Sequence, residues 1–221
     1  MSDFIPAKIT LALITIFISA CASFAPGMRY QDLIRPRQPT ARAVQEGLDI
    51  SVEEFATESK SRQAFDADLA SSGVLPLLIR IENRGDQSFR IRENEIQVFL
   101  GGSPLTQLIG GEASDQSASS EYAGKAFLWT MAAGPFAILL WPSTIAASAT
   151  HTHGVNRKIR QHFESLQFVD MLVKPNQVAA GFVYFKLPDG TKSIKDLAVA
   201  IEPVREQDGT RLPYRLDLTS K

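Results

Sequence analysis

A stretch of 25 residues without a charged side chain, 126–150, lies between two regions in which apolar and polar residues alternate. Its length is enough for a membrane-spanning helix, which needs about 20 consecutive apolar residues. The alternation predicts β-strands on both sides of it, within 74–100 and within 178–218. A single crossing would put these strands on opposite sides of a bilayer, where they cannot pair. The fold is therefore constrained by how this stretch leaves and re-enters the domain.

Two prolines argue against a straight helix in this stretch. Pro135 and Pro142 each remove a backbone donor and clash with the preceding helical turn. The Gly134-Pro135 pair predicts a reversal, so that 126–149 forms an apolar hairpin of two short helices. Three placements remain open: a hairpin inserted into lipid or a partner, helices buried within the domain, and a true span. The first is favoured because an apolar surface of this size is rarely left in water.

Apolar residues at helical spacing predict an amphipathic helix over 155–168, directly after the apolar stretch. Arg157, Lys158 and Arg160 give it a basic flank. Cations near anionic headgroups gain about 1 kcal/mol each, although a solvated helix face would have the same composition. The residues expected to contact the membrane or a partner are Trp129, Phe136, Leu139, Trp141, Arg157 and Lys158.

A second apolar run lies at the N-terminus, over 9–18, and follows Lys8. Ten residues are too few to cross a bilayer as a helix, but they match the apolar region of a secretory signal. The run ends in Ile18-Ser19-Ala20-Cys21, which contains the only cysteine of the chain. A lone cysteine in an exported protein cannot form an internal disulfide, so a reactive or modified thiol is expected.

These four residues resemble the lipobox of bacterial lipoproteins, in which an aliphatic residue and two small ones precede a cysteine. The resemblance covers only residues 1–21 and implies a signal peptide over 1–20 and acylation of Cys21. Two or three acyl chains, at about 0.8 kcal/mol per buried methylene, anchor a protein stably. The next residue is Ala22 rather than the aspartate that commonly retains such proteins at the inner membrane, which favours the periplasmic face of the outer membrane. An ordinary cleaved signal or a short buried helix with an incidental cysteine are the alternatives.

The rest of the chain predicts a mainly β fold with a helical insertion. Prolines and the lack of a period predict a tether over 21–46. Seven or so short strands separated by turn signals then predict an antiparallel β-sandwich of immunoglobulin-like type over 47–221. A loop and helical insertion over 101–168 interrupts this domain. The alternation slips at 92–95, which predicts a bulge or a second turn there.

No combination of residues predicts catalysis or a cofactor. The phosphate-binding, dinucleotide-binding, nucleophile-elbow and zincin motifs are absent from the sequence. His151, His153 and His162 are the only clustered metal-ligand types, and without a cysteine or a well-spaced carboxylate they do not predict a metal site. A formal net charge of −1 gives no field that favours nucleic acid.

The sequence therefore predicts a non-enzymatic envelope lipoprotein that acts as an interaction or scaffolding module at the membrane. Its expected partners are the membrane, through acylated Cys21 and possible contacts of 126–149, and a protein partner or a second copy. A carrier or binding protein for a lipid or other apolar ligand, with 126–149 lining the site, is the alternative. A hydrolase with an unrecognised site is a third hypothesis.

Overall fold

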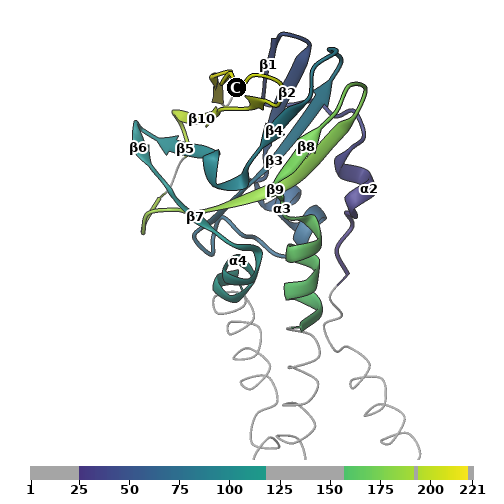
Figure 1. Ribbon diagram of the computed structural model, residues 1–221. Coiled ribbons are helices and arrows are strands. Elements are labelled where there is room, and N and C mark those ends of the chain that lie inside the picture. The colour runs from purple at the N-terminus through teal and green to yellow at the C-terminus, as the bar shows by residue number, and fades with distance from the viewer. Residues whose placement is uncertain (1–24, 118–156, 192–193, 219–221) are drawn as a thin grey trace, which may run out of the picture.

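The computed structural model describes residues 25–117, 157–191 and 194–218. The described chain forms three antiparallel sheets and a few short helices (Figure 1). The prediction of a mainly antiparallel β fold is confirmed. Cys21, Trp129, Phe136, Leu139 and Trp141 lie outside the described residues.

The sheets have five, four and three strands. The five-stranded sheet has the order β1 (Ala41–Gln45), β2 (Leu48–Glu54), β3 (Val74–Asn83), β9 (Val178–Lys186) and β7 (Thr106–Leu108). The four-stranded sheet has the order β12 (Tyr214–Leu218), β10 (Leu197–Ile201), β5 (Gln97–Leu100) and β6 (Ser103–Pro104). The three-stranded sheet has the order β11 (Val204–Arg205), β4 (Phe89–Ile91) and β8 (Met171–Val173).

The two strands at the centre of the five-stranded sheet come from opposite sides of the apolar stretch. β3 and β9 pair antiparallel from Val74 opposite Lys186 to Glu82 opposite Val178. Strands that share backbone hydrogen bonds lie on the same side of a membrane. β3 and β9 therefore lie on one side of any membrane that this protein contacts.

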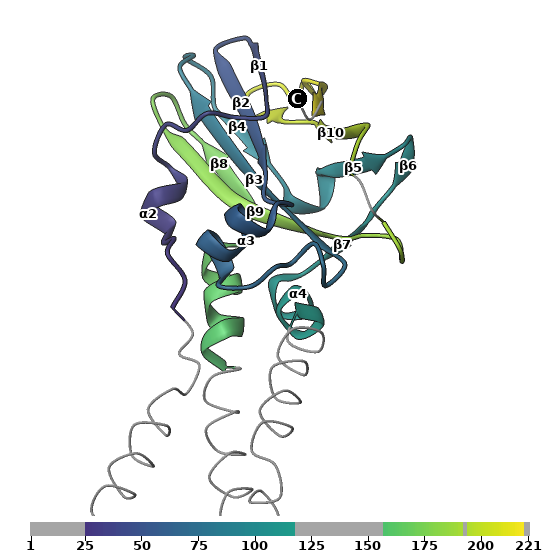
Figure 2. The same ribbon diagram turned by 180° about the vertical axis from the view of Figure 1, so that it is seen from behind.

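Each face of the five-stranded sheet covers a separate core. Alternate residues such as Ile50, Ile79 and Val183 pack between this sheet and the two smaller ones. The opposite set, which includes Leu78 and Phe182, packs under helices. These helices are α2 (Tyr30–Leu33), α3 (Glu58–Phe65), α4 (Gly110–Ser117) and a helix whose described part is 157–166. Figure 2 shows α3 and α4 toward the lower end of the fold and α2 at its side.

Local signals explain where α3 begins and ends and how the chain passes between the two smaller sheets. Thr57 caps α3, since its hydroxyl accepts the N–H of Lys60 at 3.4 Å, and Asp66 ends it in the left-handed conformation. The slip at 92–95 is a short 3-10 helix, η1 (Glu93–Glu95). It carries the chain from β4 of the three-stranded sheet to β5 of the four-stranded sheet.

The predicted tether over 21–46 differs from the structure in its described part. Met28 and Leu33 are only 2% and 0% exposed, and they pack in the core under the helices. Residues 41–45 form β1 at the edge of the five-stranded sheet. Isolated apolar residues without a period can thus dock on a surface supplied by distant strands.

A glycine allows the chain after the helix at 157–166 to cross β9 at close range. The N–H of Phe168 donates to the carbonyl of Phe182 at 2.8 Å. A Cβ on Gly181 would lie 2.5 Å from the Cα of Phe168, which is a backbone atom that cannot rotate away. Only glycine fits at this position of β9.

We therefore expect Gly181→Ala to lower the free energy of unfolding by about 3 kcal/mol or more, because the added methyl group overpacks a backbone crossing. Urea denaturation followed by circular dichroism measures this. Gly102→Ala is the control: Gly102 has a φ of +82° but open space around its Cα, so only backbone strain of about 1 kcal/mol is expected. Equal losses in the two variants would contradict the crossing.

Candidate functional site

Three points where the described chain stops lie at one end of the domain. The chain before α2, the end of α4 and the start of the helix at 157–166 are together at the lower end of Figure 1, and Figure 2 places them at the same end. Residues 1–24 and 118–156 both connect here. We call this end the base of the domain.

The two helices that flank 118–156 are fastened to each other. Arg160 in the second helix forms an ion pair with Asp115 in α4, with 2.5 Å between Nη2 and Oδ2. At the other end of α4, the N–H of Gly110 donates to Oε1 of Gln167 at 2.8 Å. A Cβ on Gly110 would lie 3.2 Å from the backbone N of Glu164, so glycine permits the close approach.

Gln167 also links this helix pair to the sheets. Its Nε2 donates to Oε1 of Glu93 in η1 at 2.7 Å, and the same oxygen accepts from Gln107 of β7 at 3.2 Å. Burial raises the pKa of Glu93, although the two amide donors oppose this. The base is thus connected to η1 and β7 by hydrogen bonds that meet at the carboxylate of Glu93.

The predicted basic helix is present, and its two predicted contact residues lie at the base. Ile159, Phe163 and Leu166 are buried on its inner side, as the spacing predicted. Arg157 and Lys158 are exposed in the first turn of its described part and have no partner among the described residues. Their exposure makes them available to a charged surface.

The histidine cluster considered in the sequence is only partly described. His151 and His153 lie outside the described residues. His162 is half-buried, with its Nε2 2.8 Å from the carbonyl of Ala64, and burial lowers its pKa. Within 25–117, 157–191 and 194–218, no three His, Cys, Asp or Glu side chains are grouped to hold a metal ion.

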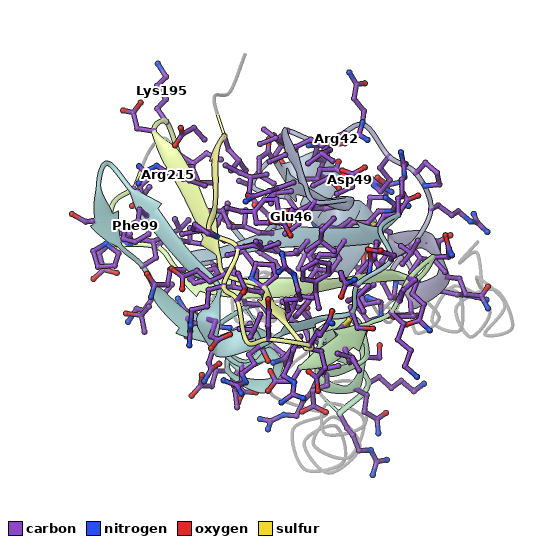
Figure 3. All side chains as sticks on the ribbon, turned by 45° about the horizontal axis from the view of Figure 1, so that its top comes forward. Arg42, Glu46, Asp49, Phe99, Lys195 and Arg215 are labelled. Atoms are coloured by element: carbon purple, nitrogen blue, oxygen red, sulfur yellow. The ribbon has the colours of Figure 1, made fainter. Side chains whose placement is uncertain are left out.

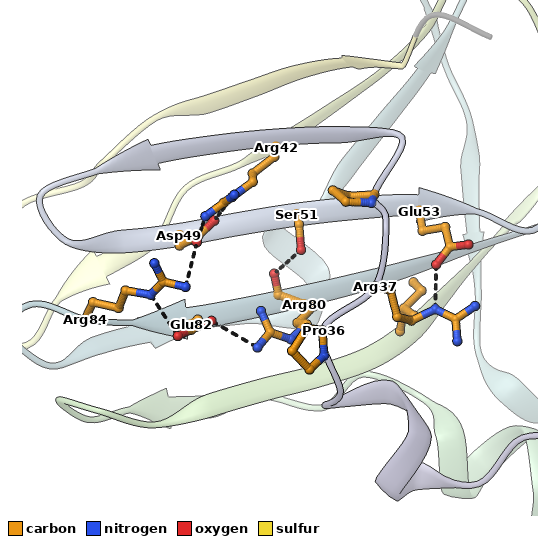
Figure 4. Close-up of a pocket in the computed structure, with 11 residues that line it drawn as sticks. Pro36, Arg37, Arg42, Asp49, Ser51, Glu53, Arg80, Glu82 and Arg84 are labelled. Atoms are coloured by element: carbon orange, nitrogen blue, oxygen red, sulfur yellow. Dashed lines mark hydrogen bonds and ion pairs between the residues drawn. The ribbon is translucent and has the colours of Figure 1, made fainter. Parts of the chain in front are cut away.

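A second feature is a charged hollow on the outer face of β1, β2 and β3 (Figure 4). Residues 34–39, which we call the strap, run over this face and form one side of the hollow. The hollow has a volume of about 140 Å³. Its lining residues are Pro36, Arg37, Pro39, Arg42, Asp49, Ser51, Glu53, Leu78, Arg80, Glu82 and Arg84.

Charges of opposite sign alternate along the sheet side of the hollow. Asp49, whose side chain is only 4% exposed, accepts two hydrogen bonds from Arg42, at 2.8 Å and 2.5 Å. Glu82 accepts from Arg84 at 2.8 Å and from Arg80 at 3.0 Å. These donors, Arg84 foremost, lower the pKa of Glu82 to about 2.

The strap is fastened to the sheet by few contacts. The Nε of Arg80 donates to the carbonyl of Ile34 at 3.1 Å. Arg37 forms a 2.7 Å ion pair with Glu53, and its guanidinium lies 5.6 Å from the ring centroid of Phe55. The hydroxyl of Ser51, at the floor of the hollow, donates to the carbonyl of Arg80 at 3.3 Å.

None of these residues was predicted to belong to a site. The alternation of apolar and polar residues puts Asp49 and Glu82 on the polar faces of their strands, which are typical of solvated positions. The register places the two residues directly opposite each other, and the strap comes from a different part of the chain. The sequence signal that could have indicated this site is the recurrence of charged residues of both signs at alternate positions of two neighbouring strands.

Another hollow, of about 230 Å³, lies on the four-stranded sheet. Its lining includes Phe99, Ala198, Arg215 and Asp217. Figure 3 shows Phe99 and Arg215 well separated from Arg42 and Asp49 of the charged hollow. The two hollows are therefore distinct surfaces.

Comparison with known proteins gives no family. No protein-family model and no curated protein matches this chain. A crystal structure of YcdA, a candidate lipoprotein of Bacillus subtilis, aligns at 9% identity and a TM-score of 0.37, over 84% of this chain and 40% of YcdA. A crystal structure of the YjhA protein of Bacillus subtilis aligns at 6% identity and a TM-score of 0.38, over 79% of this chain and 93% of YjhA. Similarities this low leave function to be argued from the residues themselves.

The depressed pKa of Glu82 predicts a pH dependence of stability. Because the folded pKa of about 2 lies below the ordinary value near 4.3, ionised Glu82 stabilises the fold above about pH 4.5, and this contribution disappears as the pH falls toward 2. Glu82→Gln should therefore be less stable than the unchanged protein at pH 6, with the difference shrinking steadily to pH 2.5. Urea midpoints measured across this range test it. A difference that is constant with pH would contradict the ion pairs.

Proposed function

We propose that this chain is a lipid-anchored envelope lipoprotein that acts as a non-enzymatic interaction or scaffolding module at the membrane. In this proposal acylated Cys21 holds the chain at the periplasmic face of the outer membrane. The anchor holds a rigid domain at the membrane, in which the sheets have an immunoglobulin-like arrangement. The anchoring part rests on the lipobox resemblance, and the rest on the geometry of the base.

The observation that carries the proposal is the convergence of chain connections at the base. The apolar stretch 126–149 leaves through α4 and returns through the helix at 157–166, and these two helices are joined by the Asp115–Arg160 ion pair. The described chain before α2, which follows the segment with Cys21, lies at the same end (Figure 1). The described residues next to both apolar parts of the chain are therefore at one end of the domain, which supports contact of both parts with a single bilayer.

Chain length adds a second argument. Cys21 and Ala25 are four residues apart, and an extended chain advances about 3.5 Å per residue, so the first described residue lies within about 14 Å of an acylated sulfur. Ala25 is fixed to the domain, because its N–H donates to Asp66 at 3.1 Å. An anchor at Cys21 would thus bring the base close to the lipid surface.

The described residues add one finding on membrane crossing. None of their helices combines the length and the apolar character that crossing a membrane needs. In the proposal, contacts with lipid or a partner are made by 126–149, Arg157 and Lys158.

Replacing the cysteine tests the anchor. We expect Cys21→Ser to abolish incorporation of radiolabelled palmitate and to change electrophoretic mobility, because the sulfur that carries the first acyl chain is gone. Ala22→Ser is the matched control and should retain the label and the membrane fractionation. Unchanged labelling or unchanged mobility and fractionation of Cys21→Ser would overturn the anchor.

A crosslinking experiment tests the role of 126–149. A photo-crosslinking amino acid at Phe136 should form adducts with lipid or with another protein molecule in intact cells, because this residue belongs to the proposed contact hairpin. The same probe at Phe99, on the four-stranded sheet, is the control and should not give those adducts. Crosslinks from Phe136 only to the chain's own sheets would favour the buried placement instead. A co-purified lipid in native mass spectrometry of detergent-free protein would favour the carrier.

A further inference from the structure

We propose that the charged hollow beneath the strap binds a small zwitterion, that is, a molecule with a carboxylate and an ammonium group separated by a short chain. The proposal is independent of the anchor and of the base. It rests on the size of the hollow, the arrangement of its charges and the bonds that its lining leaves unused.

The size of the hollow suits a molecule of amino-acid dimensions. A site for one water needs about 10–15 Å³ on this measure of volume, so 140 Å³ has room for roughly ten water-sized groups. The strap supplies Pro36, Arg37 and Pro39 on one side, and the sheet supplies Ser51 and Leu78 on the other. Among the lining residues that belong to the sheet, only Leu78 is aliphatic. Its side chain can pack against a short carbon chain of a ligand.

The charges of the lining favour a ligand that carries both signs. Asp49 and Glu82 line the hollow beside Arg42, Arg80 and Arg84, and the pKa of about 2 keeps Glu82 ionised at neutral pH. A carboxylate oxygen that accepts one hydrogen bond from an arginine keeps a second lone pair, which an ammonium group can use. A zwitterion can pair with the acidic and the basic groups of the lining at once, whereas a simple anion or a simple cation pairs with only one of the two sets.

The guanidinium groups have hydrogen bonds to spare. Arg80 uses Nε for Ile34 and Nη2 for Glu82, and Arg42 uses Nε and Nη2 for Asp49. Arg84 uses Nε for Glu82, and its Nη2 lies 3.7 Å from Asp49. This leaves the Nη1 atoms of Arg42, Arg80 and Arg84 without a hydrogen-bond partner among the described residues. Guanidinium N–H groups pair strongly with carboxylates, so these atoms are suited to the acidic end of the ligand. Asp49 and Glu82 are suited to its ammonium end.

Three probes with the same carbon chain test the proposal: 4-aminobutanoate, butanoate and butylammonium. Isothermal titration calorimetry on the full chain in detergent micelles should detect 4-aminobutanoate with a dissociation constant below about 10 mM, given the weak affinity of ligands of this size. The two singly charged probes should bind at least about tenfold more weakly, since each can pair with only one of the two sets of charged groups in the lining. No binding of 4-aminobutanoate, or equal binding of butanoate, would overturn the proposal.

Two variants locate the binding. Ser51→Leu should abolish it by filling the hollow without removing a charge, and Ser103→Leu, the same change on exposed β6, should not affect it. Arg84→Gln should weaken it about tenfold, and the 60% exposure of Arg84 makes a folded variant attainable. Circular dichroism verifies that each variant folds. Unchanged binding in both Ser51→Leu and Arg84→Gln would overturn the site.

Discussion

Backbone pairing between β3 and β9 is the constraint on which the rest of the structure depends. The two strands lie at the centre of the five-stranded sheet, and both faces of β9 are buried except at its ends. Burying one large apolar side chain contributes about 1.5–3 kcal/mol, and this pair contributes side chains to both cores. Because β3 precedes the apolar stretch and β9 follows it, any position of 126–149 must leave this pairing intact.

The helix pair at the base meets that requirement. α4 and the helix at 157–166 bring the two ends of the intervening segment together through Asp115, Arg160 and Gln167. Gln167 then reaches Glu93 in η1, the element that passes the chain between the two smaller sheets. The described residues on both sides of the intervening segment are thereby connected to the sheets by short hydrogen bonds.

Period-2 alternation was sufficient to predict β3, β9, β10 and β12, since each buries one face or both. The slip at 92–95 was predicted, but its form as a 3-10 helix depends on where β4 and β5 pair, which local sequence does not determine. The strap was missed because its residues carry no period. The burial of Asp49 and Glu53 was missed because it depends on arginines and on a covering segment elsewhere in the chain.

The same packing of the strap and α2 changes what an anchor at Cys21 would do. A free tether from 21 to 46 would span up to about 90 Å when extended and would let the domain rotate above the membrane. With Met28 and Leu33 buried, that reach falls to the four residue steps before Ala25. A domain held at Cys21 and at 126–149 has two attachments at one end, and two attachments resist rotation where one does not. In such an arrangement the charged hollow and the four-stranded sheet would be presented at fixed positions relative to the base.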